Sequence, residues 1–306
     1  MANFSIGTMA ELATALSVAP QEFDEIVRNR NRYYRIIQIQ KIDGGTRTLN
    51  VPQDRLKSLQ DGIRRRLLDR VKQLECVHGG VRGRSVITNS MPHLHKDVVF
   101  KLDIKDFFPT VGPRAVNSIF RVLGFGPEAS QVLVEATTLD GQLPQGAPTS
   151  VALANLAMYR VDRRLLRLAR LHGFDYTRFV DDLTLSGTSR LLGFRRLICR
   201  IVEEDGFTVN PKKLQTMLAG SRQIVTGIVV NDKPNLPKEQ RDEIRRLVVK
   251  LASSEHSGVR IATVRGKLAW LAYVNPAKAC RLQSRAPIIA SEPSNFSQKV
   301  TPAREA

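Results

Sequence analysis

The chain has 306 residues, and its hydrophobic content of 42% suits a globular protein and excludes a wholly disordered one. It carries 47 Lys and Arg against 29 Asp and Glu, which gives a formal net charge of +18 and a sequence pI near 10.4. This charge indicates a polyanionic partner, and nucleic acid fits better than a membrane because no apolar run reaches about 18 residues. Three widely spaced cysteines in no metal-ligand pattern predict reduced thiols and a cytoplasmic protein.

The N-terminal part is predicted to be helical up to about residue 30. Met1–Ala19 lacks a basic region ahead of its mildly apolar stretch, so we expect a short helix here and no signal peptide. A second helix should start after Pro20. Tyr33–Ile42 and Arg47–Val51 then alternate in polarity around an Asp-Gly-Gly turn, which predicts a β-hairpin.

Pro52 is predicted to begin an amphipathic helix that continues to about Val71. The Gly-rich, basic stretch His78–Ser85 must be a loop. Val98–Ile104 is then predicted to form a largely buried strand, with Asp103 near its C-terminal end. A carboxylate in an apolar strand is costly unless it is paired, ligated or placed at an exposed strand end, so Asp103 is a candidate functional residue.

A second special loop, Leu143–Ser150, precedes a long helix that we expect to run from a cap at Thr149 or Ser150 to about Arg170. The stretch Arg178–Ser186 follows. It has two adjacent acids between short runs of alternating polarity, which is the pattern of strand, tight turn and strand.

Two interpretations are open for these acids, Asp181 and Asp182. Asp is a favoured turn residue, so they could belong to an ordinary hairpin turn. Adjacent carboxylates also repel each other, and a divalent cation is the usual way to offset that repulsion. With Asp103 on a neighbouring strand they would offer hard oxygen ligands suited to magnesium or manganese. Two such ions about 3.5–4 Å apart can support phosphoryl transfer on a nucleic acid.

The rest of the chain predicts short mixed elements and then a helical, basic part beyond a boundary near residue 232. The expected elements are a helix over Ser189–Glu204, a strand over Phe207–Val209, a basic turn over Asn210–Lys213, a strand over Ile224–Val230 that is interrupted at Gly227, and helices over Pro237–Ala252 and Ile261–Val274.

Three stretches resemble the central palm motifs of reverse transcriptases in order and separation: Leu102–Phe108, Gln145–Ser150 and Phe179–Asp182. Asn89–His93 is similar to the Asn-Ala-x-x-His segment of bacterial retron reverse transcriptases, and Val225–Gly227 to their Val-Thr-Gly segment. The chain is therefore identified as a member of that family over residues 30–280. It departs from the family pattern next to the acids, with a Phe at position 179 where Tyr is usual.

The resemblance implies an α+β fold, that of a right-hand polymerase with fingers, a palm built on an antiparallel sheet, and a helical thumb. Fingers and palm would occupy residues 1–232, including the N-terminal helical segment 1–30. The thumb would occupy residues 233–286, and residues 287–306 would form a flexible tail.

The resemblance also implies individual roles. Asp103 and Asp181 would ligate two Mg²⁺ ions, for which Mn²⁺ could substitute, with Asp182 in support and the Ile104 carbonyl as a further ligand. Lys213, or less directly Lys212, would protonate the departing pyrophosphate. Residues toward the incoming deoxynucleoside triphosphate would be Lys41, Arg47, Phe108, Gln145, Gly146 and Phe179, with Phe108 as the steric gate against a 2′-hydroxyl. Residues toward RNA would be Asn89, His93, Val225, Thr226 and Gly227.

Each role has a plainer alternative. Arg47 and the lysines could be solvated surface charges, Phe108 could be a packing residue, and a lone His is more often a packing or capping residue than a ligand. The function implied is an RNA-directed DNA polymerase that copies part of a structured non-coding RNA into multicopy single-stranded DNA and works with an effector or toxin protein in antiphage defence. The alternatives are another bacterial reverse transcriptase, either of a different defence-associated type or like those of group II introns, and a catalytically inactive RNA-binding scaffold.

Overall fold

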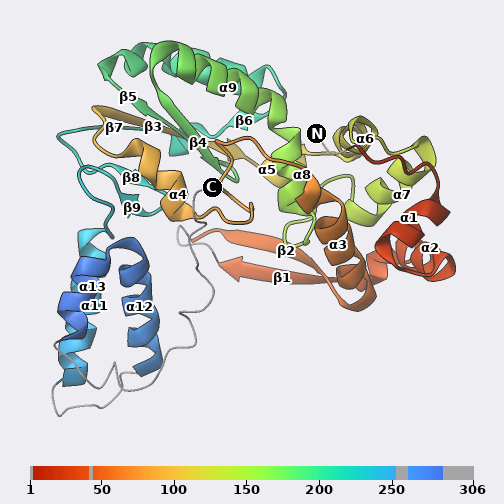
Figure 1. The fold of residues 1–306 in the computed structure, drawn as a ribbon, viewed down its shortest axis with the longest axis horizontal. Helices are drawn as coiled ribbons and strands as arrows, with labels where there is room; N and C mark the ends of the chain where they lie inside the picture. Colours follow the sequence, from red (N-terminus) through yellow and green to blue (C-terminus); the bar gives the residue numbers. More distant parts are fainter. Residues whose placement is uncertain (1–2, 41–43, 253–260, 285–306) are drawn as a thin grey trace, which may run out of the picture. The chain divides into compact units, whose positions relative to one another are not determined.

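The computed structural model describes residues 3–40, 44–252 and 261–284. The chain divides into two compact units, Met1–Thr226 and Gly227–Ala306. The division follows Thr226, whereas the sequence suggested a boundary near residue 232. The first unit combines helices with antiparallel strands, and the second is mainly helical (Figure 1).

Short helices and a β-hairpin begin the first unit, as the sequence predicts. The hairpin pairs β1 with β2 in an antiparallel register that places Ile39 opposite Arg47. Helix α3 ends at Arg66, and a separate 3₁₀ turn over Leu68–Arg70 follows it, so the single helix predicted to reach Val71 is wrong in its length. Residues 41–43, which include Lys41 and the first residue of the predicted Asp-Gly-Gly turn, lie outside the described residues. The elements are α1 (Met9–Leu16), α2 (Pro20–Arg28), β1 (Tyr34–Gln40), β2 (Thr46–Pro52) and α3 (Asp54–Arg66).

A five-stranded antiparallel sheet forms the centre of the first unit, with β3 as its middle strand (Figure 1). The order is β4-β5-β3-β6, and β7 also pairs with β3, along the edge that β6 occupies further on. Strand β7 has no predicted counterpart because its residues are mostly exposed and show no alternation. The strands are β3 (Val98–Lys105), β4 (Asp175–Phe179), β5 (Asp182–Gly187), β6 (Thr208–Val209) and β7 (Gln215–Leu218).

Helices surround this sheet. The helix predicted from Thr149 to Arg170 is broken at Met158 into α8 and α9, and neither predicted cap forms. Thr149 makes no side-chain cap bond, and the Ser150 hydroxyl donates to the Pro144 carbonyl instead. The helices are α4 (Val86–Ser90), α5 (Phe107–Thr110), α6 (Pro113–Val122), α7 (Pro127–Thr137), α8 (Ser150–Ala157), α9 (Tyr159–His172) and α10 (Arg195–Glu203).

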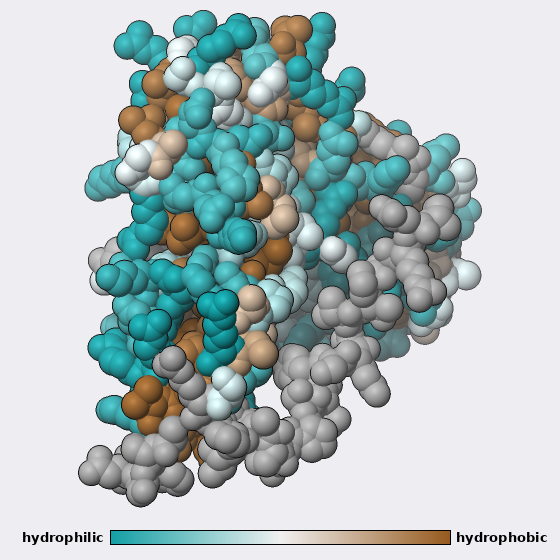
Figure 2. Space-filling model, turned by 60° about the vertical axis from the view of Figure 1, so that its left-hand side comes forward, coloured by the Kyte–Doolittle hydropathy of each residue, from teal (hydrophilic) through white to brown (hydrophobic). Residues whose placement is uncertain are grey.

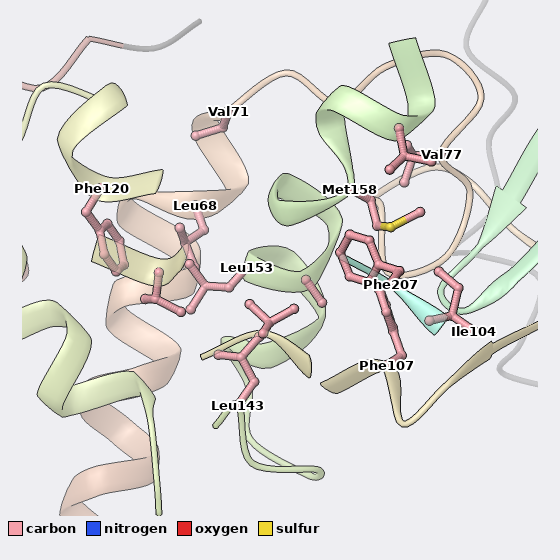
Figure 3. Close-up of a cluster of buried hydrophobic side chains, with 14 of the residues drawn as sticks. Leu68, Val71, Val77, Ile104, Phe107, Phe120, Leu143, Leu153, Met158 and Phe207 are labelled. Atoms are coloured by element: carbon pink, nitrogen blue, oxygen red, sulfur yellow. The ribbon is translucent and has the colours of Figure 1, made fainter. Parts of the chain in front are cut away.

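One hydrophobic core joins the sheet to these helices (Figure 3). Figure 3 shows Phe107, Phe207 and Met158 packed together beside Ile104, at the end of β3 that carries Asp103. The Phe107 and Phe207 rings lie 6.0 Å apart. Burial of side chains of this size is worth about 1.5–3 kcal/mol each, so this packing stabilises the end of the strand next to the acids.

Within its described residues, the second unit contains three helices that pack on one another: α11 (Lys238–Ala252), α12 (Ile261–Val274) and α13 (Pro276–Gln283). Helices α11 and α12 confirm the predicted ones, whereas α13 was not predicted. Strand β8 (Ile224–Val225) closes the first unit and β9 (Ile228–Val229) opens the second, one on either side of Gly227.

The face shown in Figure 2 is largely hydrophilic, with small separate hydrophobic patches. Within the described ranges, no helix combines the length and the apolar character that crossing a membrane would require. All three cysteines are free thiols, as predicted.

Candidate active site

The sheet brings the three predicted acids to one end of its two central strands. Strand β3 pairs with β5 so that Asp103 lies opposite Asp182. The Ile104 backbone N–H donates to the Asp181 carbonyl at 3.0 Å, which draws the hairpin turn against the end of β3. The two stretches that the sequence singled out therefore meet, although almost eighty residues separate them.

The turn between β4 and β5 has an unusual backbone. Phe179 pairs with Asp182, and Val180 between the strands has a φ of 59°, a left-handed conformation that is strained for a β-branched residue. Two contacts hold it in place. The Arg178 guanidinium donates to the Val180 carbonyl at 2.8 Å, and Gly79 packs so closely that an added Cβ would lie 2.4 Å from the Val180 nitrogen.

Burial and mutual repulsion govern the charges of the acids. Burial raises the pKa of Asp181 above its ordinary value, and the nearby charge of Asp103 raises it further. Burial also raises the pKa of Asp182, against the opposing effect of the Lys101 ammonium 2.9 Å away. A site that makes carboxylates costly to ionise is one where added positive charge is favourable.

Lys101 and Lys213 supply part of that positive charge. The Lys213 ammonium lies 2.9 Å from Asp103 Oδ1, and this hydrogen bond raises the pKa of Lys213. Topology explains its position: β6 and β7 both run along β3, and residues 210–214 bridge the gap between them next to Asp103. The Asn210 backbone N–H donates to the Asp103 carbonyl at 2.8 Å, and the Asn210 side chain accepts from the Lys212 backbone N–H. Of the two neighbouring lysines at 212 and 213, it is thus Lys213 whose ammonium pairs with an acid of the site.

The three carboxylates suit a magnesium ion that is bound partly by the protein and partly by waters and substrate phosphates. In the part of the chain that the structure describes, no group of three or more His, Cys, Asp or Glu side chains is gathered closely enough to hold an ion alone. Mg²⁺ is commonly bound through one or two carboxylates together with waters and substrate phosphates, and not by an all-protein cage. The carboxylates of Asp103, Asp181 and Asp182 are hard oxygen donors of that kind.

Two of the predicted nucleotide-binding residues, Gln145 and Gly146, lie on a loop that contacts strand β2. The Asn50 backbone N–H, on β2, donates to the Gln145 carbonyl at 2.8 Å. Gly146 has a φ of 106° and lies against β2, where an added Cβ would be 3.1 Å from Val51 Cγ2. The β1–β2 hairpin is thereby attached to the Gln145–Gly146 loop. Arg47, on the same strand, is close enough for its charge to oppose the rise in the pKa of Lys213.

The two aromatic residues expected near the nucleotide are half-buried. Phe108 follows β3 on the short helix α5, with its ring tilted against Phe107 at 5.5 Å. Phe179 ends β4 directly before the turn. Both residues are therefore partly accessible to solvent, and their proposed contacts with a nucleotide stay predictions.

A buried ionic network that the sequence did not suggest lies behind the turn. Arg178, whose side chain is fully buried, binds Asp162 on α9 through two hydrogen bonds, and the Tyr176 hydroxyl donates to the same carboxylate. Arg178 also donates to Asn155 Oδ1 on α8, and the Asn155 amide donates to the Gly79 carbonyl. The network thus links both helices to the turn and to the glycine that supports it.

The residues predicted to bind RNA make contacts inside the protein. The side chains of Asn89, His93 and Val225 are fully buried. Asn89 donates to the Thr226 hydroxyl at 3.3 Å, and the two His93 ring nitrogens each lie 2.7 Å from a hydroxyl, those of Ser186 and Thr177. Gly227 belongs to the second unit, with a φ of 81°. A direct contact between these buried side chains and RNA would need a rearrangement, and their RNA-binding role stays a prediction.

Comparison with known proteins agrees with the motifs. A family model described as reverse transcriptase (RNA-dependent DNA polymerase) matches residues 39–251. The chain is 39% identical to the Retron Mx65 reverse transcriptase of Myxococcus xanthus over 84% of this chain and 65% of that protein. It is 34% identical to the Retron Mx162 reverse transcriptase of the same organism, over 78% of this chain and 57% of that protein.

The chain thus spans less than two thirds of the length of both Myxococcus proteins. The Retron Ec86 reverse transcriptase of Escherichia coli is 30% identical, and there the match covers 88% of this chain and 84% of the relative. The chain thus belongs to the reverse transcriptase family, among the bacterial retron reverse transcriptases, and has that family's α+β fingers-and-palm fold.

Proposed function

We propose that this protein is an RNA-directed DNA polymerase of the retron type. The observation that carries the proposal is the register of β3 and β5, which places Asp103 opposite Asp182 and draws Asp181 to the same strand end. Paired carboxylates at that position are what nucleotidyl transfer needs to hold two Mg²⁺ ions against a triphosphate.

Each residue has a distinct part in this proposal. Asp103 and Asp181 hold the metal ions, with Asp182 and the Ile104 carbonyl in support, and the ions when bound lower the cost of charge on the attacking hydroxyl and the leaving phosphate. Lys213 stands beside Asp103 and gives a proton to the departing pyrophosphate. Arg47 binds the triphosphate from the β1–β2 hairpin, with Lys41 as a second candidate outside the described residues.

The remaining residues around the nucleotide select and position it. Gln145 and Gly146 line the pocket of the incoming deoxynucleotide, and Phe179 lies next to the acids as an aromatic platform. Phe108 excludes a 2′-hydroxyl. Met1–Thr226 serves as fingers and palm, and the helices after Gly227 serve as the thumb.

The substrate in this proposal is a structured non-coding RNA, of which a part is copied into multicopy single-stranded DNA in the cytoplasm. Support comes from the relatives, which are named as retron reverse transcriptases, and from the net charge of +18. We further propose that the product acts with an effector protein in antiphage defence.

Primer extension on an RNA template with Mg²⁺ and deoxynucleotides tests the polymerase. The double variant Asp181→Asn/Asp182→Asn should lose extension. A matched control, Asp97→Asn/Asp175→Asn, removes two carboxylates at the opposite end of the same strands and should extend like the unaltered protein. If Asp181→Asn/Asp182→Asn extended the primer as well as the control variant does, the metal assignment would be wrong.

The retron assignment has a separate test. Nucleic acid that co-purifies with the protein is sequenced, and one RNA species joined to DNA is expected. Recovery of random cellular RNA alone would leave a polymerase without a retron substrate and refute that part of the proposal.

A further inference from the structure

Helix α9 carries a row of arginines on its exposed face. Arg160, Arg163, Arg164, Arg167 and Arg170 recur at intervals of three and four residues, and we call them the arginine stripe. The opposite face of the helix is buried, at Val161, Asp162, Leu165 and Ala169. Because α9 packs on β4 at one side of the sheet (Figure 1), the stripe points away from the core.

Protein carboxylates neutralise three of the five arginines in the stripe. Arg160 pairs with Asp205, Arg164 with Glu204, and Arg170 with Glu75. Among the described residues, no carboxylate forms an ion pair with Arg163 or Arg167, and both side chains are exposed. Like charges four residues apart on a helix repel each other, so a bound anion would stabilise Arg163 and Arg167.

Arg163 and Arg167, together with Arg170, border a hollow of about 1050 Å³. Lys72 and Arg84, from the segment before the His78–Ser85 loop and from within it, add two further cations to its lining. Glu75 is the acid in that lining, and Arg170 already neutralises it. The Tyr159 ring lies 5.9 Å from the Arg163 guanidinium carbon and holds that side chain at the rim. All residues that line the hollow lie outside the predicted catalytic and nucleotide-binding sets.

We propose that the arginine stripe and this hollow bind the phosphate backbone of folded RNA, apart from the strand that is being copied. Guanidinium groups suit this ligand because their planar donors match phosphate oxygens. From Arg160 to Arg170 the helix rises about 15 Å. The stripe is therefore long enough to face several consecutive phosphates of one RNA strand.

The ligand is RNA and not the DNA product, and here the inference rests on the proposed function. A surface that holds the template in place must be occupied before the first nucleotide is added, and only RNA is present at that stage. An acidic protein is the competing ligand that the experiment must exclude.

The test uses the full chain and a fluorescein-labelled RNA hairpin in a fluorescence anisotropy titration over a range of salt concentrations. The variant Arg163→Gln/Arg167→Gln removes the two unpaired charges. The control Arg65→Gln/Arg114→Gln removes two exposed helical arginines of α3 and α6 that lie elsewhere in the same unit.

We expect the stripe variant to bind the hairpin at least about 10-fold more weakly, with a salt slope smaller by about 0.7–0.9 for each phosphate that is no longer neutralised. The control should bind like the unaltered protein. Extension of a short unstructured template–primer should be equal in all three. An equal loss of binding in both variants, no loss in either, or binding of polyglutamate that RNA does not displace would overturn the proposal. Failure of the unaltered protein to extend any primer would count against the proposed function, while the binding comparison would still decide the role of the stripe.

Discussion

Arg178 and Asp162 form a bidentate ion pair in which both side chains are buried, with Nε 2.9 Å from Oδ1 and Nη2 2.7 Å from Oδ2. The pair joins β4 to α9, and the remaining guanidinium nitrogen of Arg178 holds the Val180 carbonyl in the turn that carries the acids. A buried pair of charges with no direct contact to substrate thus sets the shape of the candidate active site.

Removal of one partner from this pair should be costly. Asp162→Asn keeps the size of the side chain but leaves the buried guanidinium without its counter-charge, which typically destabilises a fold by about 3–5 kcal/mol. Urea denaturation followed by circular dichroism measures the free energy of unfolding. Asp175→Asn serves as control because it disrupts a half-exposed ion pair with Lys96, where a loss within about 1 kcal/mol is expected. Equal losses in the free energy of unfolding of both variants would contradict the prediction that Asp162 stabilises the fold more than Asp175 does.

The predicted role as proton donor distinguishes Lys213 from its neighbour Lys212. Lys213→Gln should slow single-turnover nucleotide incorporation by about 10²- to 10⁴-fold because the leaving pyrophosphate loses its proton donor, whereas Lys212→Gln should change it little. Lys213→Arg keeps a positive partner for Asp103 but holds its proton too tightly to donate it, so it should also be slow. A fast Lys213→Arg variant would mean that the residue acts only through its ion pair with Asp103.

Phe108 should control the choice of sugar. Phe108→Ala is expected to raise incorporation of ribonucleotides relative to deoxynucleotides by about 10-fold or more, since the bulk opposed to the 2′-hydroxyl is removed. Phe107→Leu on the same short helix alters a buried neighbour and should leave the ratio unchanged. Competition between a ribonucleotide and its deoxy analogue on one template gives the ratio directly, and an unaltered ratio in Phe108→Ala would refute the gate.

His93 should make stability depend on pH. Burial lowers the pKa of His93 to about 3, whereas a histidine in an unfolded chain titrates near 6.5. Below that pH the unfolded chain takes up a proton that the folded protein does not. The free energy of unfolding should therefore fall by about 1.4 kcal/mol per pH unit between pH 6 and pH 3, and be fully retained above pH 6.5.

His93→Gln would remove this contribution. Urea titrations at several pH values should then show a shallower acid slope in the variant than in the unaltered protein. Parallel slopes would show that His93 is not the group responsible.

The sequence predicted the strands around the three acids well because they carry strong local patterns. Val98–Ile104 is apolar with one acid, and the acids at 181 and 182 divide two alternating runs, so both elements could be located without a structure. Strand β7 has neither an apolar run nor alternation, and only its pairing with β3 makes it a strand. The break at Met158 has no Pro or Gly to mark it within a continuous apolar pattern.

The supporting residues were harder to foresee because their partners are distant in the sequence. Arg178 looks like an ordinary charge on a strand, and only the position of Asp162 on α9 shows that it is buried and paired. Asn89 and His93 were expected to face RNA, but their neighbours in space are residues of the sheet and of β8 and its following turn. Long-range pairing of polar side chains leaves no periodic signal in a single sequence.

The contact between Gly79 and Val180 limits how the candidate active site can be redesigned. Since not even a methyl group fits at Gly79, the loop and the acidic turn form a single matched piece. A chimera that takes its acidic hairpin from another member of the family should be active only if the loop is transplanted with it. For protein engineering, the smallest exchangeable module of this site is therefore a pair of segments about a hundred residues apart.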